Sequence, residues 1–370
     1  MVNDSGMNTV ASSAAGKSRK RVKTTPFEIG GKSIKPGEHS AVDLPIPNLY
    51  THSSMTWPVY VIHGKKPGPV MFLSGAVHGD EINGVEIIRR VLKSRSVKRL
   101  RGTLIALPVV NIFGFINQTR YLPDRRDLNR AFPGSERGSL AARMANLFLQ
   151  EIVSRCTHGI DLHTAAIHRD NLPQVRAVLS DPETEKMARA FISPVIVDTP
   201  IVEGTLRSAA QKLGVPVIVY EAGEALRFDE VAIRAGVKGV ISTMRDLGML
   251  PRSRRIRKQV EPIVARSTTW IRASKSGIIR TVKPLGALVE KDEIMGIISD
   301  PFGEEEQSVR APSEGIIIGR TNIPLVNEGE ALFHLAKFKD AENVLEQVEE
   351  FQNEMDPTTD SIPSTEPPIV

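Results

Sequence analysis

Short apolar runs alternate with amphipathic stretches along the first two thirds of the chain. The apolar runs have the length of buried strands, and they cover residues 57–62, 70–73, 102–108, 159–163 and 216–221. The amphipathic stretches repeat apolar residues at three- and four-residue steps, which predicts helices; they cover residues 84–92, 139–153, 183–191, 205–213 and 229–247. Strands that alternate with helices predict an α/β sheet covered on both faces. A Lys-Lys-Pro-Gly stretch at 65–68 predicts a hairpin-like turn between the first two strands.

The pattern changes near residue 252, after which short β-like runs are separated by Gly and Pro. Residues 276–294 and 314–331 form a near-repeat, which predicts a small two-sheet β domain with pseudo-symmetry. This domain resembles the barrel-sandwich domains that carry biotin or lipoate. The hairpin at 299–306 has no lysine to modify, so covalent cofactor attachment is not expected.

The division that follows from these patterns has four parts: a disordered basic tail at 1–25, an α/β domain at 26–251, a β domain at 252–338 and an acidic tail at 339–370. Within the acidic tail, residues 340–353 suit a helix, and the remainder is expected to be mostly disordered.

Composition narrows the class of protein. The net charge of +5 is modest, and the basic cluster at 17–23 has no interleaved aromatic residues, which argues against nucleic-acid binding. No apolar run reaches membrane-spanning length, and the N-terminus lacks the apolar core of a signal peptide. The single cysteine, Cys156, fits a reducing compartment. We therefore expect a cytoplasmic protein that acts on a small molecule, with no nucleic-acid or membrane partner.

Three chemically versatile residues follow predicted strands. His78 and Glu81 lie between strand 70–73 and helix 84–92, and His163 ends strand 159–163. The carboxyl edge of an α/β sheet is where ligand crevices form, and two His and one Glu can hold a catalytic zinc while leaving a position open for water. The pair His78 and Glu81 alone also fits an ordinary helix N-terminus, where the dipole favours Asp80 and Glu81.

Two carboxylates accompany this set. Asp161 points to the same side of its strand as His163 and is a candidate for orienting that ligand. Glu221 ends strand 216–221 and is a candidate general base, although a solvated strand-end charge is the alternative for it alone.

The loop at 111–134 is rich in Arg, Asn and Asp. Amide hydrolysis builds negative charge on the carbonyl oxygen, which a fixed cation stabilises, and a substrate carboxylate suits a bidentate arginine. Arg120 and Arg130 offer both functions. The alternative is a surface loop with scattered, individually weak salt bridges.

Four motifs in order resemble the succinylglutamate desuccinylase/aspartoacylase family, a branch of the zinc carboxypeptidase superfamily. They are His-Gly-Asp-Glu at 78–81, Asp-Leu-Asn-Arg-Ala-Phe-Pro-Gly at 127–134, Asp-Leu-His-Thr-Ala at 161–165 and Tyr-Glu-Ala-Gly at 220–223. The resemblance spans roughly residues 45–250 and implies a zinc-carboxypeptidase-like mixed sheet with helices on both faces. The C-terminal β domain fits the family as well.

The resemblance also implies site residues. It places one Zn²⁺ per chain on His78, Glu81 and His163, with Glu221 as the base. Asn129 and Arg130 would bind a substrate carboxylate, and Arg120 would polarise the scissile carbonyl. Because the loop is longer here than in aspartoacylase, Arg125 or Arg126 is an alternative for that last role. Arg176 is placed near the substrate.

We therefore expect a zinc-dependent hydrolase of linear amides that removes an acyl group, acetyl or succinyl-like, from an N-acyl amino acid or related small amine. A homo-oligomer is expected by default. A carboxypeptidase-like enzyme acting on short peptides is the first alternative. A non-catalytic binding or scaffold protein is the second.

Overall fold

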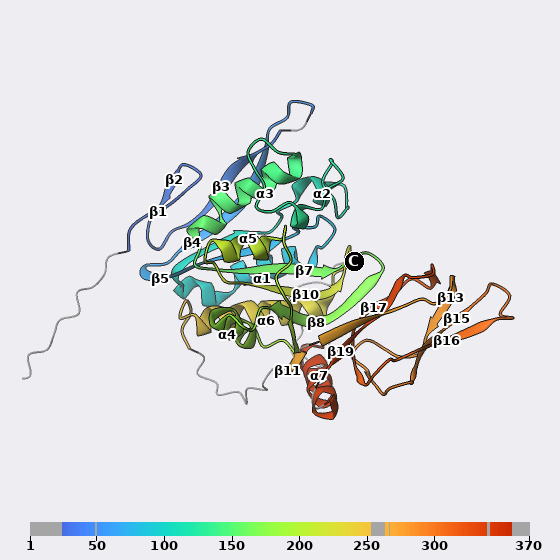
Figure 1. The fold of residues 1–370 in the computed structure, drawn as a ribbon. Helices are drawn as coiled ribbons and strands as arrows, with labels where there is room; N and C mark the ends of the chain where they lie inside the picture. Colours follow the sequence, from blue (N-terminus) through green and yellow to red (C-terminus); the bar gives the residue numbers. More distant parts are fainter. Residues whose placement is uncertain (1–23, 49, 253–262, 266, 339–340, 357–370) are drawn as a thin grey trace, which may run out of the picture.

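A large mixed sheet organises the protein (Figure 1). The structure is a computed structural model, and it describes residues 24–48, 50–252, 263–265, 267–338 and 341–356. The sheet order is β12-β19-β17-β8-β10-β7-β5-β6-β4-β3. Strands β6, β5, β7 and β10 run parallel, whereas β3 and β4 pair antiparallel with their neighbours. Strand β8 pairs antiparallel with β10 and β17 and parallel with β9. The mixed α/β class predicted from the sequence is confirmed.

The elements of the α/β part have the following bounds. The strands are β3 (His39–Ile46), β4 (Met55–His63), β5 (Lys66–Gly75), β6 (Arg101–Leu107), β7 (His158–Ala165), β8 (Arg169–Ala177), β9 (Val195–Asp198) and β10 (Val217–Glu224). The helices are α1 (Asn83–Lys93), α2 (Ile112–Ile116), α3 (Leu140–Glu151), α4 (Pro182–Ala190), α5 (Leu206–Lys212) and α6 (Glu230–Asp246). Three 3₁₀ turns lie at Arg95–Arg99, Leu128–Arg130 and Val153–Arg155, and β1 (Phe27–Ile29) and β2 (Lys32–Ile34) form a separate two-stranded sheet.

Helices cover both faces of the sheet because successive residues of each strand point to opposite sides. On β5, Met71 and Leu73 belong to one core, which α1, α4 and α6 complete. The intervening Phe72 belongs to a second core, which contains side chains of α3 and α5. Figure 1 shows these two helix layers on either side of the strands.

The sequence-based expectations differ from the structure at two places. No hairpin joins β4 to β5, because β6 lies between them in the sheet, antiparallel to β4 and parallel to β5. The hairpin prediction was therefore wrong: residues 66–68 already belong to β5, and the neighbour of β5 on that side, β6, arrives later in the chain. Strand β8 was also not predicted, and its Pro173 and charged residues depart from a strand pattern.

The C-terminal β region continues the same sheet. Its strands are β11 (Ile263–Ala265), β12 (Ser267–Arg272), β13 (Gly277–Thr281), β14 (Leu288–Val289), β15 (Ile294–Ser299), β16 (Glu306–Arg310), β17 (Gly315–Thr321), β18 (Leu325–Val326) and β19 (Ala331–Lys337). Strand β17 pairs with β8, with Gly319 opposite Asn171. Strands β16, β15, β13 and β18 form a separate four-stranded sheet.

The near-repeat has a structural counterpart. The short strand of each half pairs with the first strand of the other: β14 pairs with β17, and β18 pairs with β13. The domain boundary near residue 252 stays a prediction, and residues 253–262 beside it lie outside the described residues.

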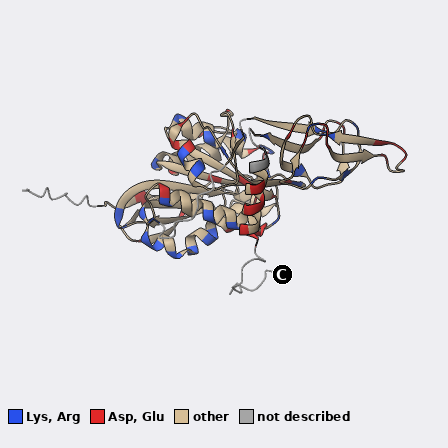
Figure 2. Cartoon of the chain, turned by 90° about the horizontal axis from the view of Figure 1, so that it is seen from below, with Lys and Arg blue, Asp and Glu red and all other residues tan. Residues whose placement is uncertain are grey.

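Helix α7 (Ala341–Met355) matches the helix expected at 340–353. Its buried Val344 and Val348 pack with Leu172 of β8 and with side chains of β17. Figure 2 shows the acidic residues gathered on this helix. The tails expected at 1–25 and beyond the helix fall mostly outside the described residues. In the part of the chain that the structure describes, no helix combines the length and apolarity needed to cross a membrane.

Candidate functional site

A tight turn between β5 and α1 presents the first two candidate ligands. The turn is fixed by backbone hydrogen bonds from Val110 N–H to Gly75 O and from Asn111 N–H to Ala76 O. Gly79 lies so close to the α2 segment that a Cβ atom there would be 2.1 Å from the carbonyl carbon of Gly114. A side chain at position 79 would therefore push the turn away from α2.

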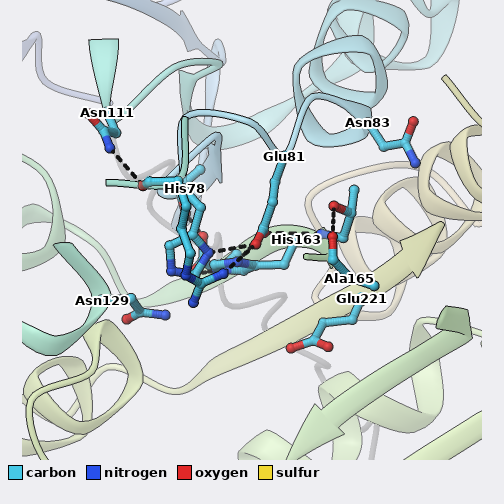
Figure 3. Close-up of polar contacts among 12 residues, drawn as sticks. His78, Glu81, Asn83, Asn111, Asn129, His163, Ala165 and Glu221 are labelled. Carbon is cyan, nitrogen blue, oxygen red and sulfur yellow. Dashed lines mark hydrogen bonds and ion pairs between the residues drawn. The ribbon is translucent and has the colours of Figure 1, made fainter. Parts of the chain in front are cut away.

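The three predicted metal ligands converge in the interior. The Nδ1 atom of His78 lies 2.7 Å from Oε1 of Glu81, and Nδ1 of His163 lies 2.7 Å from Oε2 of the same carboxylate. All three side chains are buried, and their candidate ligand atoms lie within 4.8 Å of one another. Figure 3 shows this convergence, with Asn129 on one side of the set and Glu221 on the other.

The far nitrogen of each histidine is held by an aspartate. Nε2 of His78 lies 3.1 Å from Oδ1 of Asp127, and Nε2 of His163 lies 2.7 Å from Oδ2 of Asp161. Ser74 donates a 2.7 Å hydrogen bond to the other oxygen of Asp161. Carboxylates in this position fix the tautomer of a metal-ligating histidine and raise its basicity. The arrangement leaves both Nδ1 atoms facing Glu81, so the donor set fits a divalent metal.

The electrostatics keep Glu81 ionised. Burial alone would raise its carboxyl pKa, but His78 and His163 outweigh that effect and hold the pKa below its usual range. Burial likewise works to lower the pKa of the His163 imidazole, but Asp161 and Glu81 raise it well above normal. Protons on the histidines would leave when a metal binds, because ligation needs the neutral imidazole.

Glu221 lies on the strand next to that of His163. Parallel pairing of β10 with β7 places Glu221 opposite His163. Its Oε2 accepts a 3.0 Å hydrogen bond from Nδ2 of Asn171 and lies 2.8 Å from Nη2 of Arg176. Both partners are on β8, so the strand missed in the sequence supplies the groups that hold this carboxylate.

Arg120 lies closer to the candidate ligands than its two alternatives. Its Nη1 lies 3.1 Å from Oε1 of Glu81, and its Nη2 lies 3.0 Å from Oδ2 of Asp127. The side chain of Arg126 is 65% exposed and lies 3.9 Å from Asp124. Arg125 is also exposed. Neither alternative lines the cavity that contains the candidate ligands.

Asn129 and Arg130 occupy a 3₁₀ turn at the rim of the site. Oδ1 of Asn129 accepts a 2.9 Å hydrogen bond from the backbone N–H of Leu206, at the start of α5. This bond fixes the amide of Asn129. Arg130 is exposed and donates from Nη1 to the carbonyl of Asn129 at 2.7 Å.

One cavity of about 270 Å³, which we call the site cavity, brings together every predicted site residue. These residues are His78, Glu81, Arg120, Asn129, Arg130, His163, Arg176 and Glu221. The wall also contains Asn171, Arg207, Trp270 and Arg320, which the sequence analysis did not assign to a site. The last two come from the C-terminal β region, and no local pattern around them indicated this placement.

The site cavity is rich in cations. Six arginines line it, against four carboxylates. The arginines are at 120, 130, 169, 176, 207 and 320, and the carboxylates are at 81, 161, 170 and 221. Burial, and then the charge of Arg176, lower the pKa of Arg207; this guanidinium donates to Thr199 Oγ1 and Pro200 O. The excess of positive charge favours an anionic ligand.

The segment of the chain that contains the site matches a model of a known protein family. Residues 67–247 match the model of the succinylglutamate desuccinylase/aspartoacylase catalytic domain. That segment contains β5, β7 and β10 and all eight predicted site residues.

Individual relatives share limited sequence identity with this chain. The N-alpha-acetyl-L-2,4-diaminobutyric acid deacetylase of Halomonas elongata is 29% identical over 181 residues, which is 47% of this chain and 51% of that protein. The match thus spans about half the length of the relative. A succinylglutamate desuccinylase/aspartoacylase structure from Rhodobacter sphaeroides has a TM-score of 0.73 at 24% identity, covering 82% of this chain and 96% of that one. The product-bound ectoine utilization protein EutE of Ruegeria pomeroyi has a TM-score of 0.75 at 22% identity, covering 86% and 99%. Both structures share the fold.

Proposed function

Residues 67–247 form a catalytic domain of the succinylglutamate desuccinylase/aspartoacylase family, and on this premise we propose that the protein is a zinc-dependent amidohydrolase. It removes an acyl group from an N-acyl amino acid or related small amine. The observation that carries the proposal is the meeting of His78, Glu81 and His163 with Glu221 and Arg120 in one cavity. The deacetylase relative acts, by its name, on an N-acetylated amino acid, which supports the same class of substrate.

One Zn²⁺ per chain would be held by His78, Glu81 and His163, with Asp127 and Asp161 orienting the two imidazoles. When bound, the ion supplies Lewis acidity, which polarises a carbonyl and brings the pKa of water near neutrality.

The protein's own residues account for the remaining steps. Asn129 and Arg130 bind the substrate carboxylate. Arg120 donates to the amide oxygen as negative charge develops there. Glu221 accepts a proton from the attacking water, whose oxygen bonds to the carbonyl carbon. Glu221 then passes that proton to the amine nitrogen as the carbon–nitrogen bond breaks.

Arg176 keeps the place near the substrate that the resemblance implied, and its contact with Glu221 gives it a second role. It lies 2.8 Å from Glu221 and lines the site cavity, so it is suited to hold the base as well as to approach substrate. The volume of the cavity, with Trp270 and Arg320 in its wall, favours a small amide over a peptide. The carboxypeptidase-like alternative is therefore the less favoured one.

The test combines metal analysis with turnover. Purified protein is assayed for zinc and for amine release from N-acetyl and N-succinyl amino acids and from short peptides. We expect one zinc per chain, lost in His78→Ala and retained in the exposed-histidine control His52→Ala. Amine release should vanish in Glu221→Ala while zinc remains. Zinc-free protein under metal-replete conditions would refute the proposal. Turnover of peptides alone would favour the carboxypeptidase-like alternative instead.

We further propose that residues 252–338 form a barrel-sandwich domain beside the catalytic domain at 26–251. The exchange of short strands between its two halves supports this assignment. A cytoplasmic location is supported by the free, buried Cys156, because free thiols persist in reducing compartments. A homo-oligomer remains part of the proposal as the common state of such enzymes.

A further inference from the structure

A second cavity, which we call the outer cavity, adjoins the site cavity. Its volume is about 550 Å³, and it shares Arg120, Ala166 and Arg169 with the site cavity. It lies between loops of the catalytic domain and the segment that joins β17 to β19. The proposed scheme for amide hydrolysis assigns no role to this cavity.

Apolar side chains from three separate segments meet in the outer cavity. Tyr121 is 50% exposed, Ile167 is 48% exposed and Leu325 is 61% exposed, and the half-buried Ile323 lies with them. Exposed apolar groups that gather in a concave place, beside polar groups, mark a site for an apolar ligand. Because three separate chain segments contribute these apolar side chains, their exposure is not an irregularity of one loop.

The two cavities define a direction for the substrate. Asn129 and Arg130 line the site cavity and are absent from the lining of the outer cavity, whereas Arg120 lines both. In the proposed binding mode, Asn129 and Arg130 hold the substrate carboxylate and Arg120 faces the carbonyl. The amine part of the substrate then lies in the site cavity. The acyl group therefore extends past Arg120 into the outer cavity.

We propose that the outer cavity is an acyl subsite that takes an unbranched apolar chain longer than acetyl. This inference rests on the proposed amidohydrolase function and deepens it by naming the acyl class. Glu330, in the lining, opposes a terminal carboxylate on that chain. The guanidinium of Arg169 lies over the Trp270 ring, 5.8 Å from its centroid, where the two cavities adjoin.

The test measures kcat/KM along a series of acyl groups on one amino acid, the one that gives the highest turnover as its N-acetyl derivative. The series is acetyl, butanoyl, hexanoyl and succinyl. Complete burial of one methylene corresponds to about a fourfold gain, or about 0.8 kcal/mol. Because the outer cavity is open to solvent, we expect about a tenfold rise from acetyl to hexanoyl. Butanoyl should exceed succinyl, which has the same number of carbons but ends in a carboxylate where butanoyl ends in a methyl group.

Variants of the lining connect the preference to the cavity. Leu325→Asp and, independently, Ile167→Asp should remove the rise from acetyl to hexanoyl, measured within each variant as the ratio of the two kcat/KM values. The control is Phe302→Asp, because Phe302 is an 85% exposed apolar residue of the same β region that lies outside both cavities. It should keep the full rise. Zinc content and circular dichroism confirm that each variant is folded.

Each failure has its own signature. Acetyl turnover with a flat series, or a preference for succinyl over butanoyl, would overturn the acyl subsite and leave the amidohydrolase proposal standing. A rise that persists in both aspartate variants would also overturn it. Zinc-loaded protein with no turnover of any member would overturn the amidohydrolase proposal together with the subsite.

Discussion

The hydrogen bond from Asn171 to Glu221 makes the proposed general base sensitive to a residue that no motif singles out. In Asn171→Ala, Glu221 loses the 3.0 Å bond to its Oε2 and keeps Arg176 at 2.8 Å on the same oxygen. Asn171 is 6% exposed, so water does not readily replace the lost donor. The carboxylate then has fewer constraints on its orientation toward the attacking water.

The size of the effect follows from that contact. A hydrogen bond to a charged group contributes about 1.5–3 kcal/mol, and about 1.4 kcal/mol of barrier is a factor of ten in rate. If the whole energy of this bond is used to orient Glu221 in the transition state, its loss lowers kcat by about 10-fold to 150-fold. KM should change little, because the substrate carboxylate is assigned to Asn129 and Arg130.

The assay is steady-state kinetics on the best N-acyl amino acid, together with zinc content and the urea midpoint of unfolding. The matched control is Asn322→Ala, which removes a 3.0 Å hydrogen bond of the same kind, from Nδ2 of Asn322 to Oε2 of Glu224. This bond lies outside the site cavity, so kcat should stay within about twofold. In Asn171→Asp a second carboxylate faces Glu221, and the acidic limb of the pH–rate profile should move to higher pH because like charges resist ionising together.

Two results would refute this reasoning. Wild-type kcat in Asn171→Ala, with stability unchanged, would mean that the bond does not orient the base. A fall in kcat that is matched by loss of zinc, or by an equal fall in Asn322→Ala, would assign the effect to general destabilisation.

Three further predictions concern the same site. Arg120→Ala should lower kcat by about 100-fold to 1,000-fold, as loss of an oxyanion donor does, whereas Arg126→Ala should leave it unchanged; equal losses in steady-state assays would contradict the assignment. Asp161→Asn should weaken zinc affinity by about 10-fold to 100-fold, measured by competition with a chelator, and unchanged affinity would argue against its orienting role. Gly79→Ala forces a Cβ to 2.1 Å from the Gly114 carbonyl carbon; it should cost about 1–3 kcal/mol of unfolding free energy in urea, and a wild-type midpoint would show that the turn can shift at no cost.

Local patterns were sufficient for most of the catalytic sheet. Strands β5, β7 and β10 are apolar runs bounded by polar residues, and the helices that follow or precede them show clear periodicity. Because parallel strands end at one edge of the sheet, the sequence also indicated which side chains would meet. His78, Glu81, His163 and Glu221 do line one cavity.

Such local patterns did not predict contacts between segments that are distant in the sequence. The hairpin expected at 65–68 failed because β6, which begins only at Arg101, inserts between β4 and β5, and no local signal encodes that partner. Strand β8 was missed because its stability comes from neighbours on both sides rather than from an apolar run. Arg320 reaches the site through the pairing of β17 with β8, and Trp270 through β12, which joins that sheet by pairing with β19; the sequence indicates neither pairing.

The pairing of β17 with β8 determines when the fold around the site can be completed during synthesis. The backbone of residues 169–171 is hydrogen-bonded to residues 319–321, so a nascent chain that ends before β17 has an unprotected edge beside the base. Bare edges of this kind recruit other strands and promote aggregation. The proposed metal ligands and Glu221 all emerge from the ribosome early, yet Asn171 acquires its last strand neighbour only when Gly319 follows. The activity we propose would thus depend on a late event in translation, and a chain that ends before β17 would be prone to aggregate.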